Sequence, residues 1–307
     1  MIRLGVISNP RSDGNAGTSA LAGFAEAQTD VAFAAPASLA ELPSVLADFV
    51  RRGVGTLAVD GGDGTLRDVL SALPPDGDWP AIALLPSGKT NLVASDVGSW
   101  GSGVAGLRRL LDRLRGDPSA IRWAQRPCLE IVRRDDPSWL VRGFLLGGGV
   151  FVHATRMSGT WAHRRGIKRG PAVILTLARV AWQSLRGHPA AQGAMNLSTG
   201  AAPPRPCFLL LATTLERLML GFWPFPPQGG GPLHWLVMWA PPHRLTAALW
   251  AAWRGRLRSD PDRGCEGGRT GALSLRLDAP FVVDGELFEP GGGGVLLRTG
   301  PSVRFVV

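Results

Sequence analysis

A glycine-rich turn that contains one aspartate is the segment of this sequence best suited to chemistry. Residues 59–65 read Val-Asp-Gly-Gly-Asp-Gly-Thr, between a short apolar run and an amphipathic stretch. Glycines let a backbone turn sharply and approach a ligand closely, and such a turn directs N–H groups and a helix N-terminus at one point, which suits phosphate. The Asp63 carboxylate suits a Mg²⁺ ion or a reacting hydroxyl. A plain capped strand–helix turn would explain only Thr65 and Asp68.

Two further segments place polar residues at turns. Gly88-Lys89-Thr90 follows an apolar run as the end of a P-loop would, but the glycine that a P-loop needs five residues earlier is Ala83. Lys89 can offer a fixed positive charge to a phosphate, or it can be a solvated loop lysine. Asp284-Gly285-Glu286 lies between apolar runs, and by itself this pattern predicts a β-hairpin.

The first 120 residues alternate strand-like and helical patterns, which positions the glycine turn between a strand and a helix. Continuous apolar strands between helices predict a parallel sheet covered on both faces. The expected strands are 4–8, 31–35, 54–59 and 81–85, and the expected helices are 17–28, 39–52, 66–73 and one from about residue 91.

After about residue 120 the pattern predicts a mostly antiparallel β domain. We therefore expect two domains, 1–120 and 121–307. The last strand runs to residue 307, so either the chain ends lie in different domains or the tail crosses back. The expected strands are 121–133, 139–152, 207–213, 233–239, 273–277, 281–283, 295–298 and 303–307, and 166–185 is the only long helix expected in the interior of this half.

Charge and cysteine content restrict the cell compartment and the partners. Residues 1–120 carry 10 Lys and Arg against 13 Asp and Glu, whereas residues 121–307 carry 23 against 11. A basic half suits nucleic acid, an anionic membrane surface or phosphate ligands, or reflects a genome that favours Arg over Lys.

The three cysteines form no zinc pattern or disulfide framework, which indicates a reducing cytosol. No apolar run reaches 18 residues, and the first residues form a strand pattern, so we expect neither a spanning helix nor a signal peptide.

The second half also holds the candidate surfaces for a lipid. Nine of the eleven Trp lie at or after Trp123, and residues 222–227 read Phe-Trp-Pro-Phe-Pro-Pro. Aromatic residues on a loop beside Arg suit a bilayer interface, although a core segment is an equal alternative. A basic cluster could meet lipid phosphates or ATP, or be a solvated helix end. It comprises Arg156, Arg164, Arg165, Lys168 and Arg169.

Four segments in order resemble motifs of the diacylglycerol kinase catalytic-domain family, which includes sphingosine and ceramide kinases. They are residues 8–12 (Ser-Asn-Pro-Arg-Ser), 61–65 (Gly-Gly-Asp-Gly-Thr), 86–94 (Pro-Ser-Gly-Lys-Thr-Asn-Leu-Val-Ala) and 283–286 (Val-Asp-Gly-Glu). NAD kinases and 6-phosphofructokinases share a related glycine turn. The resemblance implies an NAD-kinase-like or phosphofructokinase-like α/β domain followed by a β-rich lipid-binding domain.

The resemblance implies a bacterial lipid kinase that uses ATP and Mg²⁺ to phosphorylate the hydroxyl of a membrane lipid such as diacylglycerol or ceramide. It implies that Asp63 holds Mg²⁺ and acts in catalysis, and that Glu286 is the candidate general base for the lipid hydroxyl, with Asp63 as its rival. The expected location is the cytoplasm, in peripheral contact with the inner face of the membrane. The implied nucleotide contacts are Asn9, Ser12, Gly61, Gly62, Gly64, Thr65, Gly88, Lys89 and Asn91.

Several positions depart from the family pattern. Lys89 replaces a Thr, Asp68 replaces a Glu, and Leu92 and His153 replace aspartates that bacterial members use in a structural Mg²⁺ network. Two alternatives therefore remain: a soluble NAD-kinase-like enzyme, and a non-catalytic pseudokinase that binds lipid or nucleotide. No nucleic-acid motif occurs, and an oligomer is compatible with the sequence.

Overall fold

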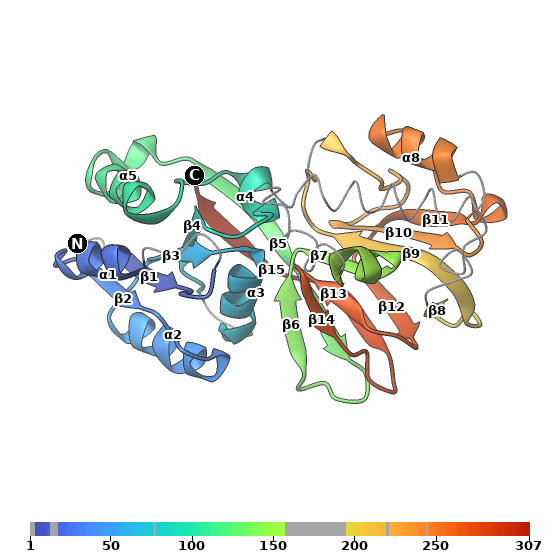
Figure 1. Cartoon of the computed structure of the whole chain (residues 1–307), viewed down its shortest axis with the longest axis horizontal. Coiled ribbons are helices and arrows are strands. Elements are labelled where there is room, and N and C mark those ends of the chain that lie inside the picture. The colour runs from blue at the N-terminus through green and yellow to red at the C-terminus, as the bar shows by residue number, and fades with distance from the viewer. Residues whose placement is uncertain (1–3, 13–17, 76–77, 157–194, 219–220, 243–244) are drawn as a thin grey trace. The chain divides into compact units, whose positions relative to one another are not determined.

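The computed structural model describes residues 4–12, 18–75, 78–156, 195–218, 221–242 and 245–307 (Figure 1). The packing of the backbone divides the chain into two compact units. The first comprises residues 1–127 and 301–307, and the second comprises residues 128–300. Both boundaries fall inside long strands, β5 (Trp123–Arg133) and β15 (Val295–Val306).

A parallel sheet forms the centre of the first unit. Its order is β2-β1-β3-β4-β15, and each neighbouring pair is parallel. β1 and β3 are buried along their whole length, as expected of apolar strands covered on both faces. The other strands of this sheet besides β15 are β1 (Leu4–Ser8), β2 (Val31–Ala34), β3 (Thr56–Gly61) and β4 (Ala81–Pro86).

Helices cover the two faces of this sheet. Side chains of a strand alternate between faces, so Leu4 and Val6 pack with the α1 and α5 core, while Gly5 faces Phe49 of α2. α3 packs beside α2. The helices are α1 (Thr18–Glu26), α2 (Leu42–Arg51), α3 (Asp63–Ala72), α4 (Leu92–Val97) and α5 (Gly103–Arg115), with short 3-10 turns at Leu39–Glu41 and Pro118–Ala120.

Antiparallel pairing dominates the second unit. β9 (Arg205–Thr213) is central and pairs with β7 (Leu145–Gly149), β8 (Met195–Thr199) and β10 (Leu233–Trp239). β13 joins β7 and β14, and β12 joins β8 and β15. The remaining strands of this unit are β6 (Leu140–Gly143), β11 (Cys265–Thr270), β12 (Ala272–Leu277), β13 (Phe281–Val283) and β14 (Glu286–Phe288).

The two faces of β9 belong to two different hydrophobic cores. Leu210 and Ala212 pack into one core, whereas Phe208 and Leu211 pack into the other, as the alternation of strand side chains requires. A helix, α8 (Leu245–Trp253), covers the second of these faces (Figure 1). A 3-10 turn at Pro261–Arg263 follows it.

The predicted fold class, a parallel α/β region followed by a mainly antiparallel region, is confirmed. The single strand expected over 139–152 is instead β6, β7 and a helical segment at 150–156. The predicted helix 166–185 lies outside the described residues, as does the basic cluster apart from the exposed Arg156. Within the residues that the structure describes, no helix is long and apolar enough to cross a membrane.

The aromatic segment 222–227 is not a bilayer-facing loop. Pro224, Phe225 and Pro226 are buried, and Phe222 and Trp223 pack against the same core as α8. The Trp223 ring contacts Phe225 edge-on at 5.1 Å between centroids. The core alternative is therefore correct, because the aromatic side chains of this segment pack into the core of the second unit.

All three cysteine thiols should be inert in the folded protein. Burial raises the pKa of Cys128 and Cys207 to about 12 and that of Cys265 to about 11, and the thiolate is the reactive form. We expect no alkylation by iodoacetamide at pH 8 without denaturant and full alkylation of three thiols in guanidinium, read by mass spectrometry. Rapid alkylation of the native protein would contradict the burial of these side chains.

Candidate active site

The glycine turn connects the end of β3 to the start of α3. Gly61 is the last residue of β3, Gly62 is extended, and α3 begins at Asp63. A Cβ on Gly61 would overlap the Thr65 side chain, so this position requires glycine. Thr65 N and Leu66 N both donate to Gly62 O, at 3.0 and 3.2 Å, and the N–H groups before them in the turn have no acceptor in the helix. The turn therefore places helix-terminal donors at the carboxyl end of β3, where they can receive an anion.

A second loop, residues 86–91 between β4 and α4, lies directly against the glycine turn. A Cβ on Gly88 would overlap Gly62 Cα, and a Cβ on Gly62 would lie 3.0 Å from Gly88 Cα. Asn91 has left-handed backbone geometry, with φ of 49°. Its side chain accepts from Gly88 N at 3.1 Å and donates to Gly88 O at 2.8 Å. The Asn91 side chain thus closes the loop and holds Gly88 against Gly62.

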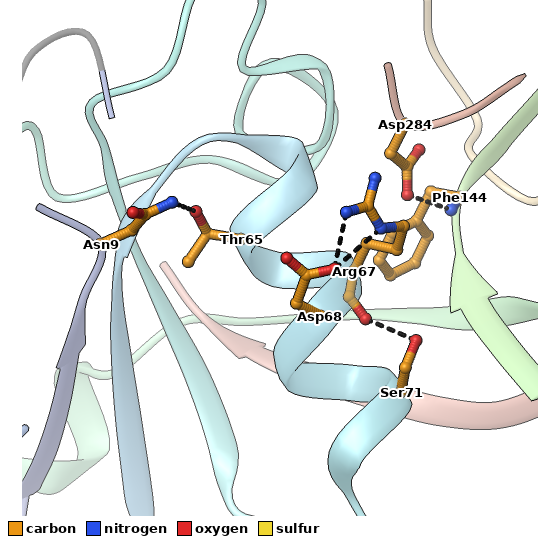
Figure 2. A network of polar contacts seen from close by, with 7 residues as sticks. All are labelled: Asn9, Thr65, Arg67, Asp68, Ser71, Phe144 and Asp284. Carbon is orange, nitrogen blue, oxygen red and sulfur yellow. Dashed lines mark hydrogen bonds and ion pairs between the residues drawn. The ribbon is translucent and has the colours of Figure 1, made fainter. Parts of the chain in front are cut away.

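A third loop, after β1, is hydrogen-bonded to both of the others. Asn9 Nδ2 donates to Thr65 Oγ1 at 2.9 Å (Figure 2), and Asn9 N donates to Asp60 O at 2.9 Å. Ser87 Oγ donates to Ser12 Oγ at 3.2 Å. The ligand sites of open parallel sheets lie outside the carboxyl ends of the strands, and these loops follow the carboxyl ends of three neighbouring strands. The structure therefore brings together the residues predicted to contact nucleotide.

A buried polar pair, which the sequence motifs do not reveal, joins the strands that lead into these loops. Ser8 Oγ donates to Asp60 Oδ2 at 2.6 Å, and Asp60 is 1% exposed. Ser8 is the last residue of β1, and Asp60 is the penultimate residue of β3. The sequence held one indication of this pair: each of the two apolar strands has a polar residue at or next to its carboxyl end. The pair fixes the ends of adjacent strands from which the Asn9 loop and the glycine turn begin.

Asp63 uses both carboxylate oxygens to hold the start of α4. Oδ2 accepts from Leu92 N at 2.8 Å and Oδ1 accepts from Val93 N at 3.0 Å. Burial raises the pKa of the Asp63 carboxyl above its ordinary value, and the two backbone hydrogen bonds oppose this rise. The carboxylate therefore joins the N-terminus of α3 to that of α4, a structural role that the spacing of the two motifs did not indicate.

The two N–H donors occupy one lone pair on each Asp63 oxygen. A carboxylate has about four lone-pair sites, so capping α4 leaves acceptor capacity on both oxygens. In the part of the chain that the structure describes, no three His, Cys, Asp or Glu side chains are grouped closely enough to bind a metal. A Mg²⁺ ion held by one or two carboxylates together with substrate phosphates does not need such a group, so the assignment of Asp63 as a Mg²⁺ ligand stays a prediction.

The four residues that depart from the family pattern lie in different surroundings. Lys89 is half-buried in the loop that Asn91 closes. Asp68 Oδ1 accepts from Arg67 Nη2 at 2.6 Å and from Arg67 Nε at 3.0 Å, as Figure 2 shows. Leu92 is buried, and its N–H is one of the donors to Asp63. His153 is exposed in the helical segment after β7.

The predicted catalytic segment 284–286 is a hairpin turn in the second unit. Val283 pairs with Glu286, and the two residues between them, Asp284 and Gly285, have φ of 46° and 90°. Two positive φ values are typical of a type I′ turn, for which Asp-Gly is a preferred sequence. Glu286 is exposed. The structure thus presents the Glu286 carboxylate to solvent from a short, well-defined hairpin.

Asp284 is a positioning residue, a role that its place in a turn sequence does not reveal. Oδ2 accepts from Phe144 N at 3.0 Å (Figure 2) and Oδ1 accepts from Leu145 N at 2.9 Å. Asp284 N in turn donates to Leu145 O at 3.0 Å. These bonds anchor the hairpin to the start of β7, so the orientation of Glu286 depends on Asp284.

Gly88→Ala should disturb the contact between the two glycine loops. Its Cβ would overlap Gly62 Cα, and forcing an extra carbon into a packed site costs about 1–3 kcal/mol. We expect a lower free energy of unfolding in urea by that amount. Gly23→Ala in α1 is the matched control, because a Cβ there meets nothing within 4 Å; it should be neutral or stabilising. Equal stability of both variants would contradict the close approach.

The raised pKa of Asp63 predicts a pH-dependent cost of folding. A carboxyl whose pKa is higher in the folded state favours folding when it is protonated, and this contribution is lost as the pH rises through that raised pKa. Asp63→Asn removes the titration. The stability of the wild type relative to Asp63→Asn should therefore fall as the pH rises from about 4, measured by urea unfolding across that range. A constant difference would show that the folded pKa is not raised.

Comparison with known proteins agrees with this geometry. Residues 3–122 match the family model of the diacylglycerol kinase catalytic domain, and no curated protein matches the chain. Among solved structures, a diacylglycerol kinase from Bacillus anthracis str. Sterne is 13% identical, with a TM-score of 0.59 and alignment over 99% of this chain and 96% of that one.

Two further structures from that organism, provisionally named diacylglycerol kinases, have the same fold. One is 13% identical with a TM-score of 0.62, covering 99% of this chain and 94% of that one. The other is 12% identical with a TM-score of 0.61, covering 99% and 96%. The motif order, the joined loops and the family model lead to one conclusion: residues 3–122 form a domain of the diacylglycerol kinase catalytic-domain family.

Proposed function

We propose that this protein is an ATP-dependent lipid kinase that transfers the γ-phosphate of ATP to the hydroxyl of a membrane lipid such as diacylglycerol or ceramide. The observation that carries the proposal is the contact between Gly62 and Gly88, backbone against backbone, at the carboxyl ends of β3 and β4. The contact lies within the residues that match the kinase family model.

The joined loops support nucleotide binding through their backbone and their polar side chains. Glycines at 61, 62, 64 and 88 leave room for phosphates to approach the main chain, and the start of α3 favours negative charge. Lys89 lies in the adjoining loop and supplies positive charge. Asn9 and Asn91 hold the three loops in one arrangement. Phosphoryl transfer depends mainly on such positioning and on charge stabilisation.

The position of Glu286 supports its assignment as the general base better than that of Asp63. Glu286 is exposed on an anchored hairpin, whereas both oxygens of Asp63 accept backbone hydrogen bonds. In the proposed step, Glu286 accepts the proton of the lipid hydroxyl as its oxygen bonds to the γ-phosphorus, and the bond from that phosphorus to the ADP oxygen breaks. ADP leaves with the electron pair.

Magnesium enters the proposal as the companion ion of ATP, which binds Mg²⁺ mainly through its own phosphates. The sequence-based assignment of Asp63 as its ligand stays a prediction, and one backbone hydrogen bond on each Asp63 oxygen leaves lone pairs for a metal. A soluble NAD-kinase-like activity is the second candidate, because NAD kinases share the glycine turn. The Asp284-Gly285-Glu286 segment, which resembles a motif of the lipid kinase family, favours a lipid acceptor instead.

Transfer of labelled γ-phosphate from ATP tests the proposal with diacylglycerol, ceramide and NAD as separate acceptors. We expect a labelled lipid with the wild type and a loss of about 10²–10⁴-fold with Glu286→Gln, the size expected for removal of a general base. Glu289→Gln is the matched control: it is an exposed glutamate of the same segment and should keep full activity. Both variants should unfold at the wild-type urea concentration.

Two outcomes would contradict the proposed activity, and a third would contradict only the role of Glu286. Label in NAD but in no lipid would assign the chain to the soluble alternative. ATP binding without transfer to any acceptor would identify a pseudokinase. Equal rates for Glu286→Gln and Glu289→Gln would remove Glu286 from the mechanism while leaving the kinase assignment intact.

A further inference from the structure

The helix α8 presents an apolar face to solvent. Its nine residues, Leu-Thr-Ala-Ala-Leu-Trp-Ala-Ala-Trp, include no charged side chain. Leu245 and Ala252 are buried, and Ala248 and Leu249 pack against the core of the second unit. A helix that is apolar all round is normally buried on every side, but α8 covers only one face of the β9–β10 region (Figure 1).

The exposed residues of α8 share one side of the helix. Thr246, Ala247, Trp250 and Trp253 are all exposed, and Arg254 follows directly. Their spacing of one, three, three and one residues places them on a single stripe. Trp250 is 61% exposed and Trp253 is 56% exposed. Two tryptophans side by side on an otherwise uncharged solvent face form an apolar patch, which indicates an interaction site.

Three arginines border this patch. Arg254, Arg256 and Arg258 are exposed within five residues of the end of α8. The Arg254 guanidinium lies over the Trp250 ring, 3.7 Å from its centroid. Among the described residues none of the three forms an ion pair, and the neighbouring Asp260 pairs with Arg263 at 3.1 Å. Asp262 is also exposed nearby. Residues 254–263 hold four arginines against two aspartates, so the edge of the patch carries a net positive charge.

We propose that α8 and its arginines dock the protein on an anionic lipid bilayer. Trp250 and Trp253 would enter the interfacial layer, where tryptophan is preferred, and the three arginines would meet anionic headgroups. Self-association of two copies through α8 would bring together two segments that each carry a net positive charge, which is unfavourable. The charge thus selects an anionic surface as the occupant of this face.

This inference rests on the proposed function, because a lipid kinase has to reach a bilayer. The residues that dock are different from those of the candidate active site. The aromatic segment 222–227, which the sequence suggested for this role, is packed in the core. α8 replaces it as the membrane-facing element. A docked α8 would keep the second unit at the surface where a lipid hydroxyl is available, so catalysis would not require extraction of the lipid into water.

Binding of the full-length protein to sedimented vesicles tests the proposal. Vesicles of phosphatidylglycerol and phosphatidylcholine should bind the wild type, and pure phosphatidylcholine vesicles should bind it much more weakly. The double variant W250A/W253A should reduce the partition coefficient by about tenfold or more. Replacing each arginine by Gln should reduce binding to the anionic vesicles by about fivefold, and high salt should mimic this loss.

Two variants make the result specific to α8. Trp123→Ala is the matched control, because Trp123 is 55% exposed but lies in the first unit; it should bind vesicles as the wild type does. Ala247→Glu puts a charge on the exposed stripe without removing any core side chain, and it should abolish binding while leaving the unfolding transition unchanged.

Wild-type binding by W250A/W253A and by Ala247→Glu would overturn the proposal, as would equal binding to neutral and anionic vesicles. If the wild type does not bind vesicles and its mass in sedimentation is higher than that of W250A/W253A, a second copy is the occupant instead.

The kinase proposal is tested separately with a short-chain diacylglycerol in solution. Phosphorylation of that acceptor without vesicle binding would remove only the docking inference, and vesicle binding without phosphorylation would remove only the kinase.

Discussion

The close approach of Gly62 to Gly88 is the constraint on which the candidate site depends. Two backbones can touch in this way only where neither residue has a Cβ, and a Cβ at either position would meet the other residue's Cα at 3.0 Å or less. The parallel pairing of β3 with β4 brings the two loops to the same edge of the sheet. The contact then leaves a surface made of main chain, with Asn9 and Lys89 around it, that is chemically suited to phosphate.

Carboxylates in this protein serve repeatedly as anchors for backbone N–H groups. Asp63 accepts from Leu92 and Val93, and Asp284 accepts from Phe144 and Leu145. Asp135 accepts in the same way from Gly292 and Gly293. Each of the three fixes a loop or helix start to a distant part of its own unit. An aspartate in a glycine-rich motif is thus as well explained by the need to satisfy buried N–H groups as by a reaction.

The second unit gives its two sheet faces different surroundings. One face of β9 packs into a core built from strands on many sides, which includes Leu210 and Ala212. The other face, with Phe208 and Leu211, is covered by α8 and by the segment around Phe225. Among the described residues, α8 and the segment around Phe225 cover that face, and the outer side of α8 is exposed. That outer side carries Trp250 and Trp253, an apolar surface that the proposed bilayer contact would cover.

The sequence by itself determined the alternation of strands and helices in the first unit, the antiparallel character of the second, and the set of residues around the glycine turn. These are local properties, since hydrophobic period, turn chemistry and motif order are all read from short segments. It missed α8, which has little amphipathic period because its outer face is also apolar. Only the rank of Ala and Leu as helix formers could have indicated it.

Only the tertiary structure decided what each polar side chain contacts. The capping of α4 by Asp63, the anchoring of the hairpin by Asp284 and the Ser8–Asp60 pair join residues 29 to 140 positions apart. The burial of the Pro-rich aromatic segment likewise follows from the sheet face beneath it, while the exposure of Trp250 and Trp253 follows from the absence of a described element over them. Such contacts depend on which surfaces the fold brings together, and no local pattern of residues carries that information.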